Sequence, residues 1–117
     1  MVEITNKSRE LTKVEQYLMT LDNGIVSMKD VEDNTSIQVV AWLEFTDTKA
    51  DGDKADMLSI LGTDNVAYTT QSDTFKESFA NIVEIMDGEQ FGIIKVSGET
   101  KSGRPYVNCI LDKSSIK

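Results

Sequence analysis

The sequence contains no histidine and only one cysteine, and these two shortages exclude several kinds of chemistry. Without histidine, the chain cannot form a His-based catalytic triad, a His-ligated zinc site or an imidazole general base. The single cysteine, Cys109, cannot form an intrachain disulfide, and its alternation with Val107 and Leu111 predicts burial as a small apolar side chain. Only carboxylate or metal–carboxylate chemistry is left for an enzyme. We therefore expect a binding protein without a cofactor.

Long apolar runs are also missing. No run approaches the ~20 residues that span a bilayer, and the polar opening MVEITNKSRELTK predicts no signal peptide. The hydrophobic content of 39% and charged content of 27% are typical of a soluble globular protein. A length of 117 residues corresponds to one domain. We expect a single cytoplasmic domain over residues 1–117 with no membrane partner.

Positive charge is scarce, with 12 Lys and Arg against 20 Asp and Glu, and a net charge of −8. This balance argues against coating DNA by bulk charge, but a local cationic groove is compatible with it. Lys101 and Arg104 lie close together in GETKSGRPYVN, around a Ser-Gly turn. A hairpin turn needs glycine but no cations. These two residues either keep an exposed turn soluble or bind a negatively charged partner.

Apolar periodicity predicts two helices. The first covers residues 8–23, where Thr12 and Glu15 have capping-box spacing and apolar residues recur at helical intervals. The second covers residues 74–87 and ends before Gly88. It begins with another capping-box spacing, Thr74 to Glu77, and its apolar stripe comprises Phe75, Phe79, Ile82, Val83 and Met86.

Alternating runs predict five strands, at residues 36–46, 57–63, 65–70, 91–99 and 105–112. In the first strand one face is entirely apolar, and it consists of Ile37, Val39, Ala41, Leu43 and Phe45. The resulting order β-β-β-α-β-β is that of the OB-fold, a five-stranded Greek-key barrel, here over residues 36–112 and preceded by the N-terminal helix. An α+β sandwich with the same elements is the alternative.

The acidic segment DTKADGDKAD, residues 47–56, suggests a calcium loop but does not match one. Asp47, Asp51 and Gly52 occupy positions one, five and six of an EF-hand. Lys49 and Leu58 stand where two acidic ligands belong. We expect a flexible, solvated loop between the first two strands and no metal site.

A family resemblance covers roughly residues 69–111. TTQSDTFKESFANIVEIM followed by FGIIKVSGETKSGRPYVNCIL resembles the C-terminal half of single-stranded DNA-binding proteins from phages of Gram-positive hosts, with the small OB-fold proteins of lactococcal phages as the nearest group. The shared features are a Thr/Ser-rich entry, a Phe-xxx-Phe helix, and a Lys-Ser-Gly-Arg-x-Tyr turn. The resemblance implies a homo-oligomer that coats single strands during phage DNA replication or recombination, in the host cytoplasm and with replication or recombination proteins as possible partners.

Binding single strands without sequence preference requires aromatic faces for bases and cations for phosphates. Three aromatic candidates follow from the strand pattern. Trp42 lies on the mixed face of the first strand, where burial under the N-terminal helix or an oligomer partner is as plausible as contact with DNA. Tyr68 is either close to the binding surface or a half-buried sheet tyrosine. Tyr106 is expected to point outward after the two cations, although a cross-strand tyrosine at a soluble hairpin has the same pattern.

Three further cations complete the predicted site. Lys95 alternates with Ile93 and Ser97 and is expected to project from the fourth strand beside the hairpin tip. Lys49 and Lys54 belong to the acidic loop, which in a barrel could fold over a bound strand. The predicted nucleic-acid-binding residues are Trp42, Lys49, Lys54, Tyr68, Lys95, Lys101, Arg104 and Tyr106.

Three hypotheses about function remain. The first is a sequence-independent single-stranded DNA-binding protein with an OB-fold. The second is an acidic protein-interaction module, either an oligomeric adaptor or a DNA mimic, that binds a replication or host protein. The third, a metal-dependent enzyme, is weak because no ligand set can be assembled from these residues.

Overall fold

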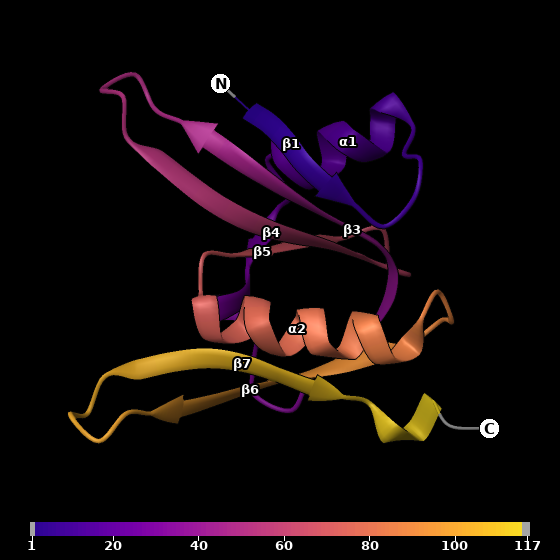
Figure 1. Cartoon of the computed structure of the whole chain (residues 1–117), viewed down its shortest axis with the longest axis vertical. Coiled ribbons are helices and arrows are strands. Elements are labelled where there is room, and N and C mark those ends of the chain that lie inside the picture. Colours follow the sequence, from indigo (N-terminus) through magenta and orange to yellow (C-terminus); the bar gives the residue numbers. More distant parts are fainter. Residues whose placement is uncertain (1, 116–117) are drawn as a thin grey trace.

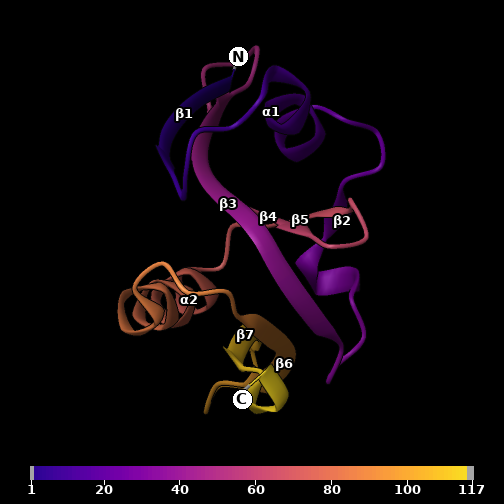
Figure 2. The same ribbon diagram turned by 90° about the vertical axis from the view of Figure 1, so that its right-hand side faces the viewer.

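Strand β3, Ser36–Thr48, is the longest strand of the computed structural model and joins the two halves of its sheet. The structure describes residues 2–115. One edge of β3 pairs antiparallel with β4 (Lys54–Gly62). The other edge pairs with β6 (Gly92–Glu99) near the start of β3 and with β1 (Val2–Lys7) near its end. The upper and lower parts of the fold in Figures 1 and 2 therefore share this one strand.

The described strands form a curled, open sheet in the order β2-β5-β4-β3-β6-β7, with β1 attached to β3. At one end β2 (Val26–Ser27) lies parallel to β5 (Ala67–Thr70). At the other end β7 (Pro105–Leu111) lies antiparallel to β6. Within residues 2–115 no ladder joins β5 to β7, so the sheet is a half-barrel with an open seam. The predicted order β-β-β-α-β-β is present as β3, β4, β5, α2, β6 and β7.

A bulge in β3 divides its apolar side chains between two cores. The register with β4 shifts between Val39 and Ala41, and such a shift reverses which alternate residues face a given side. Residues before the shift pack beneath α2 in a lower core, which Trp42 also contacts. Residues after the shift pack beneath α1 in an upper core. The five residues predicted to share one apolar face are all buried, but they belong to two cores instead of one.

Helix α1 spans Lys13–Thr20 and is shorter than the predicted helix over 8–23. Its N-terminus is the expected capping box, in which Thr12 and Glu15 each bond to the other's backbone N–H. Arg9 adds an ion pair to Glu15 with a 2.8 Å N–O distance. The inner face of α1 buries Met19 in the upper core.

Helix α2 spans Asp73–Met86 and supplies Phe75 and Phe79 to the lower core, as predicted. Its N-cap is Ser72, which accepts a hydrogen bond from the Phe75 N–H, so the capping box expected at Thr74 was wrong. The C-cap residue that follows Met86 is Asp87, whose φ of +46° is left-handed.

Two segments differ from the sequence prediction. The N-terminal segment forms β1, in which Val2 and Ile4 alternate with polar residues, and this strand was not predicted. The acidic segment is mostly a hairpin and not a flexible loop, because β3 and β4 pair as far as Thr48 and Lys54. Short 3-10 helices also follow β2 and β7, at Met28–Asp30 (η1) and Lys113–Ser115 (η2).

Candidate functional site

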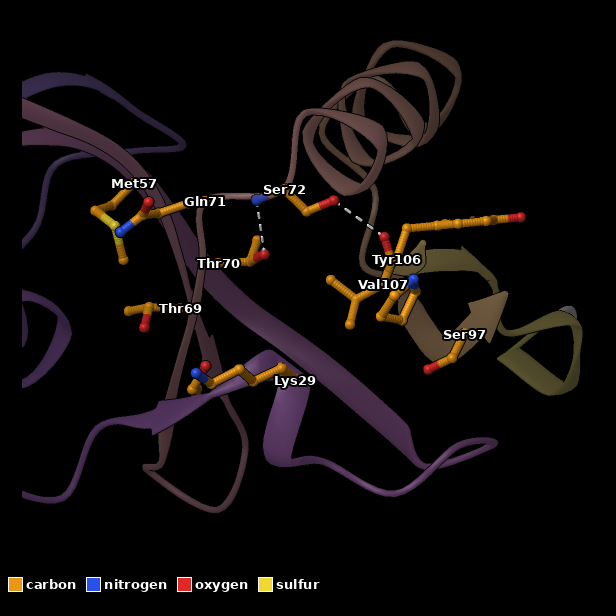
Figure 3. Close-up of a pocket in the computed structure, with 11 residues that line it drawn as sticks. Lys29, Met57, Thr69, Thr70, Gln71, Ser72, Ser97, Tyr106 and Val107 are labelled. Atoms are coloured by element: carbon orange, nitrogen blue, oxygen red, sulfur yellow. Dashed lines mark hydrogen bonds between the residues drawn. The ribbon is translucent and has the colours of Figure 1, made fainter. Parts of the chain in front are cut away.

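A cavity of about 690 Å³ lies at the open seam of the half-barrel. β5, β2 and η1 form one side, β6 and β7 form the opposite side, and the segment that leads into α2 closes the upper end (Figure 3). Its lining residues are Ser27, Lys29, Met57, Thr69, Thr70, Gln71, Ser72, Ser97, Pro105, Tyr106 and Val107. We refer to this cavity as the seam groove.

None of the described residues that line the seam groove carries a carboxylate, although the chain has 20 acidic residues. Its lining includes one cation, Lys29, which forms no ion pair within residues 2–115. Two other cavities have linings of mixed charge: one contains Glu89 together with Lys7 and Arg9, and the other contains Glu44 and Glu84 together with Lys76. The seam groove is therefore suited to a negatively charged or neutral polar ligand.

Hydrogen bonds from Ser72 fix the upper end of the seam groove. Ser72 Oγ donates to the Val107 carbonyl oxygen at 3.1 Å, which links the start of α2 to β7. The Ser72 N–H donates to Thr70 Oγ1 at 3.0 Å, which links the same residue to β5 (Figure 3). These two bonds span the seam that the sheet leaves open.

The side of the groove formed by β5 carries hydroxyl groups without protein partners. Thr69 is 8% exposed and lines the groove, and its cross-strand neighbours are Ser59 on β4 and Ser27 on β2. Cross-strand neighbours share a face of the sheet. Ser59 is fully buried, and its Oγ has no hydrogen-bond partner among residues 2–115. In the described part of the chain, the side chains of Thr69 and Ser27 also form no hydrogen bond.

The structure groups Lys101, Arg104 and Tyr106 on the β6–β7 hairpin, as predicted from the sequence. Bonds between Thr100 and Arg104 close the turn, where Gly103 has a φ of +83°. Lys101 and Arg104 are exposed. The Tyr106 ring lies on Gly98 of β6, since a Cβ added there would be 2.5 Å from its hydroxyl oxygen. This is the cross-strand arrangement, and the ring extends away from the seam groove in Figure 3.

Trp42 lies apart from the seam groove. Its ring meets Phe79 of α2 edge-on, with centroids 6.0 Å apart, and it is only partly exposed. The predicted cover for Trp42 was the N-terminal helix, and the cover that the structure shows is α2. The bulge in β3 explains the difference, because it turns Trp42 toward the lower core.

Tyr68 is the half-buried sheet tyrosine that the sequence left as one of two interpretations. It packs against the lower core, and its hydroxyl donates to Asp64 Oδ2 at 3.0 Å. Burial and, to a smaller extent, this hydrogen bond raise the pKa of Tyr68 above its usual value. The adjacent Thr69, on the opposite face of β5, is the residue that reaches the groove.

Lys95 does not project beside the hairpin tip, and the expectation that it lies on an exposed surface was wrong. The residue is 4% exposed, and its Nζ donates to the Val31 carbonyl oxygen at 2.7 Å and to Asp33 Oδ1 at 3.0 Å. A hydrogen bond from Ser97 and this contact with Lys95 lower the pKa of Asp33. Lys95 therefore ties β6 to the segment before β3.

Lys49 and Lys54 are exposed on the β3–β4 hairpin. They stand among four acidic residues of the same segment, Asp47, Asp51, Asp53 and Asp56. Within residues 2–115 no group of three or more Asp, Glu, His or Cys side chains is arranged to hold a metal ion. This hairpin is thus less suited to a polyanion than the β6–β7 hairpin is.

The sequence prediction missed Lys29, Thr69 and Ser27. Lys29 and Ser27 belong to a segment for which no element was predicted. A signal was present for Ser59, which is a polar residue within the apolar run of residues 57–61, whereas Thr69 is followed by a second polar residue, Thr70, and does not stand out. Such residues meet only if their strands become neighbours in the sheet. The alternation within each strand does not specify which strands pair.

Other possible centres of reactivity are limited. Burial raises the pKa of the Cys109 thiol to about 12, so it remains protonated at neutral pH.

No helix within residues 2–115 is both long enough and apolar enough to cross a membrane. Comparison of the chain with protein-family models, curated proteins and solved structures gave no significant match.

Proposed function

We propose that this chain is a single-stranded DNA-binding protein built on an open variant of the OB-fold. The order β3, β4, β5, α2, β6, β7 and the pairing of β3 with both β4 and β6 support an OB-fold. OB-folds bind extended strands across their second and third strands and the loops beside them. In this chain those positions correspond to β4, β5 and the two hairpins. The resemblance of residues 69–111 to phage proteins supports the same proposal.

The observation that carries the proposal is the carboxylate-free seam groove in a chain of net charge −8. Acidic side chains are excluded from this groove, and Lys29 lies within it. Lys101 and Arg104 are exposed on the adjoining hairpin, which extends to the same side of the molecule as the β3–β4 hairpin in Figure 1. A phosphate backbone requires such a local concentration of positive charge.

A single strand fits this geometry better than a duplex. The seam groove offers polar groups along which an extended chain can lie. Acidic residues elsewhere repel a second strand. We propose binding without sequence preference and without a catalytic step.

The experiment is a titration of labelled oligo-dT at several salt concentrations, followed by fluorescence anisotropy, with a matched duplex as control. Replacing Lys101 and Arg104 together by Ala should weaken binding and reduce the slope of log K against log salt by about 1.4, or ~0.7 for each phosphate contact. The matched control is the double Ala variant of Lys49 and Lys54, which removes the same charge from the acidic hairpin and should change the slope less.

Emission from Trp42 gives a second readout. Because α2 covers its ring, we expect oligo-dT to bind with little quenching of Trp42. If oligo-dT does not bind at low salt, the proposed function is wrong. Strong quenching of Trp42 would move the interface from the seam groove to the side of α2.

The exposed face of α1 favours self-association as a second property, and here we propose a second copy of the chain as the partner. Val14, Tyr17 and Leu21 are 68%, 52% and 61% exposed. Lys13 begins α1 and Asp22 follows its end, so each charge lies where the dipole of its own helix disfavours it. An antiparallel second copy of α1 brings each charge near the favourable end of the partner helix.

A further inference from the structure

The hydroxyl groups beside the seam groove form a row across three strands. Ser59, Thr69 and Ser27 are consecutive cross-strand neighbours on β4, β5 and β2. Thr69 is more than nine-tenths buried, lines the groove and has no partner for its hydroxyl in the described part of the chain. Within residues 2–115 the buried atoms without a partner include Ser59 Oγ but not Thr69 Oγ1, so the Thr69 hydroxyl is open to the groove. A ligand in the groove can therefore reach it.

Lys29 adds a positive charge to the row of hydroxyl groups and thereby favours a negatively charged ligand. Its side chain lines the groove on the same side as Thr69, with Val107 opposite (Figure 3). A hydroxyl donates one hydrogen bond and an ammonium group donates up to three. With no carboxylate in the lining, these donors are suited to the oxygens of a phosphate group.

Stacked bases are a poorer fit for the same groove. Tyr106 is the one aromatic residue of the lining, and its ring points away from the cavity. Base stacking needs a ring face. The remaining apolar surface of the groove comes from Met57, Pro105 and Val107.

We infer that the seam groove holds the phosphate backbone of the strand, with one phosphate group bound by Lys29 and the hydroxyls of Thr69 and Ser27, while the bases face outward. This inference rests on the proposed function. It explains binding without sequence preference, because phosphate contacts carry no base information. The shared chemistry is a phosphate oxyanion, supplied by a DNA strand or by a free phosphate compound.

Two variants test the subsite. Lys29→Ala removes an exposed cation, and Thr69→Val removes a hydroxyl that lines the groove, with little change in volume. The control is Lys113→Ala, which removes an exposed lysine of η2, just after the end of β7 and therefore at the opposite end of the β6–β7 ribbon from the hairpin tip. Circular dichroism establishes that each variant folds. Each protein is titrated with oligo-dT and with an abasic strand of the same length, and pyrophosphate is the competitor.

We expect wild-type protein and the control to bind both strands. Lys29→Ala should weaken both and reduce the salt slope by about 0.7. Thr69→Val should weaken both by roughly tenfold, as expected for a hydrogen bond to a charged group. Pyrophosphate should compete with the strand on wild-type protein and much less on Lys29→Ala.

Three outcomes would overturn the inference, and a fourth would overturn the proposed function. If both variants bind oligo-dT like wild-type protein, the subsite is wrong while DNA binding stands. If the variants lose oligo-dT but keep the abasic strand, the groove holds a base. If pyrophosphate does not compete with the strand, no phosphate site exists there. If neither strand binds wild-type protein but pyrophosphate does, the groove serves a free phosphate compound and DNA binding fails.

Discussion

The Lys95 ammonium group is buried against the Asp33 carboxylate, with Nζ and Oδ1 3.0 Å apart. The lysine side chain is 5% exposed, whereas the aspartate is 52% exposed. The same ammonium also donates to the Val31 carbonyl oxygen. One charged group therefore fastens β6 to the segment that precedes β3, and its cost of burial is offset by two hydrogen bonds.

Replacing Lys95 by Met should destabilise the fold without weakening DNA binding directly. The apolar side chain fills similar space but leaves the Val31 carbonyl oxygen without its donor, so we expect a loss on the order of 2 kcal/mol in the free energy of unfolding. Urea denaturation measures it, with Lys54→Ala as the exposed-lysine control. If Lys95→Met leaves the free energy of unfolding unchanged but weakens DNA binding, Lys95 belongs to the DNA-binding interface.

The ion pair at the start of α1 should make stability depend on acid pH. The hydrogen bond from Arg9, with a smaller contribution from the Thr12 backbone N–H, lowers the pKa of Glu15 from 4.5 to about 2. A lowered pKa contributes stability that is complete above the unfolded value and is lost as pH falls toward the folded one. Glu15→Gln keeps a group that can cap Thr12 but does not titrate.

Thermal unfolding of wild-type protein should therefore show a steeper decline in Tm between pH 4.5 and about 2 than the unfolding of Glu15→Gln. Near neutral pH the variant should be the less stable of the two. Parallel pH profiles would mean that the Arg9–Glu15 contact contributes nothing in solution. Glu10→Gln is the matched control, since Glu10 is 92% exposed.

Ser59→Ala should leave stability unchanged or raise it by on the order of 1 kcal/mol. The Ser59 hydroxyl is fully buried on β4 and has no hydrogen-bond partner in the part of the chain that the structure describes, so its removal relieves an unpaired polar group. Urea denaturation of the two proteins provides the comparison. A clear loss of stability would mean that the hydroxyl is satisfied in solution, for example by a bound water, and Ser59→Cys would then share the loss.

The sequence predicted local structure well because the apolar periods are regular. The stripe of Phe75 and Phe79 identified α2, and Gly103 identified the tip of the β6–β7 hairpin. Strand β1 was missed because it is an edge strand whose pattern is carried by only two apolar residues, Val2 and Ile4. Edge strands obtain much of their stability from the ladder they join, here the end of β3.

The candidate site was predicted less well, because its composition depends on which strands and side chains become neighbours in the fold. Residue types alone do not specify these neighbours. Alternation placed Trp42 on an outer face, but the bulge between Val39 and Ala41 turned it toward α2. Lys95 has the pattern of an exposed lysine, and only the folded position of Asp33 explains its burial. Ser27 lies beside Thr69 at the groove because β2 pairs with β5, a contact between segments about 40 residues apart along the chain.

Self-association through α1 is the remaining prediction. The side chains of Val14, Tyr17 and Leu21 on a two-turn helix bury far less than the roughly 800 Å² per partner of a standard interface. We therefore expect a weak, concentration-dependent dimer. Sedimentation velocity over a wide range of concentrations should show it, and Tyr17→Glu should abolish it. Ile85→Glu is the matched control, because Ile85 is 80% exposed but lies on α2.

The charges at the ends of α1 distinguish an antiparallel dimer from other modes of association. Lys13→Glu or Asp22→Lys alone should weaken the dimer, because each places like charges near one another across the interface. The double variant, Lys13→Glu with Asp22→Lys, again places opposite charges near one another across the interface. It should recover part of the association. If Ile85→Glu, and not Tyr17→Glu, disrupts the dimer, the interface lies on α2. A monomer at every concentration would leave the exposed face of α1 to a different partner, and the same Tyr17→Glu variant would then test binding of that partner.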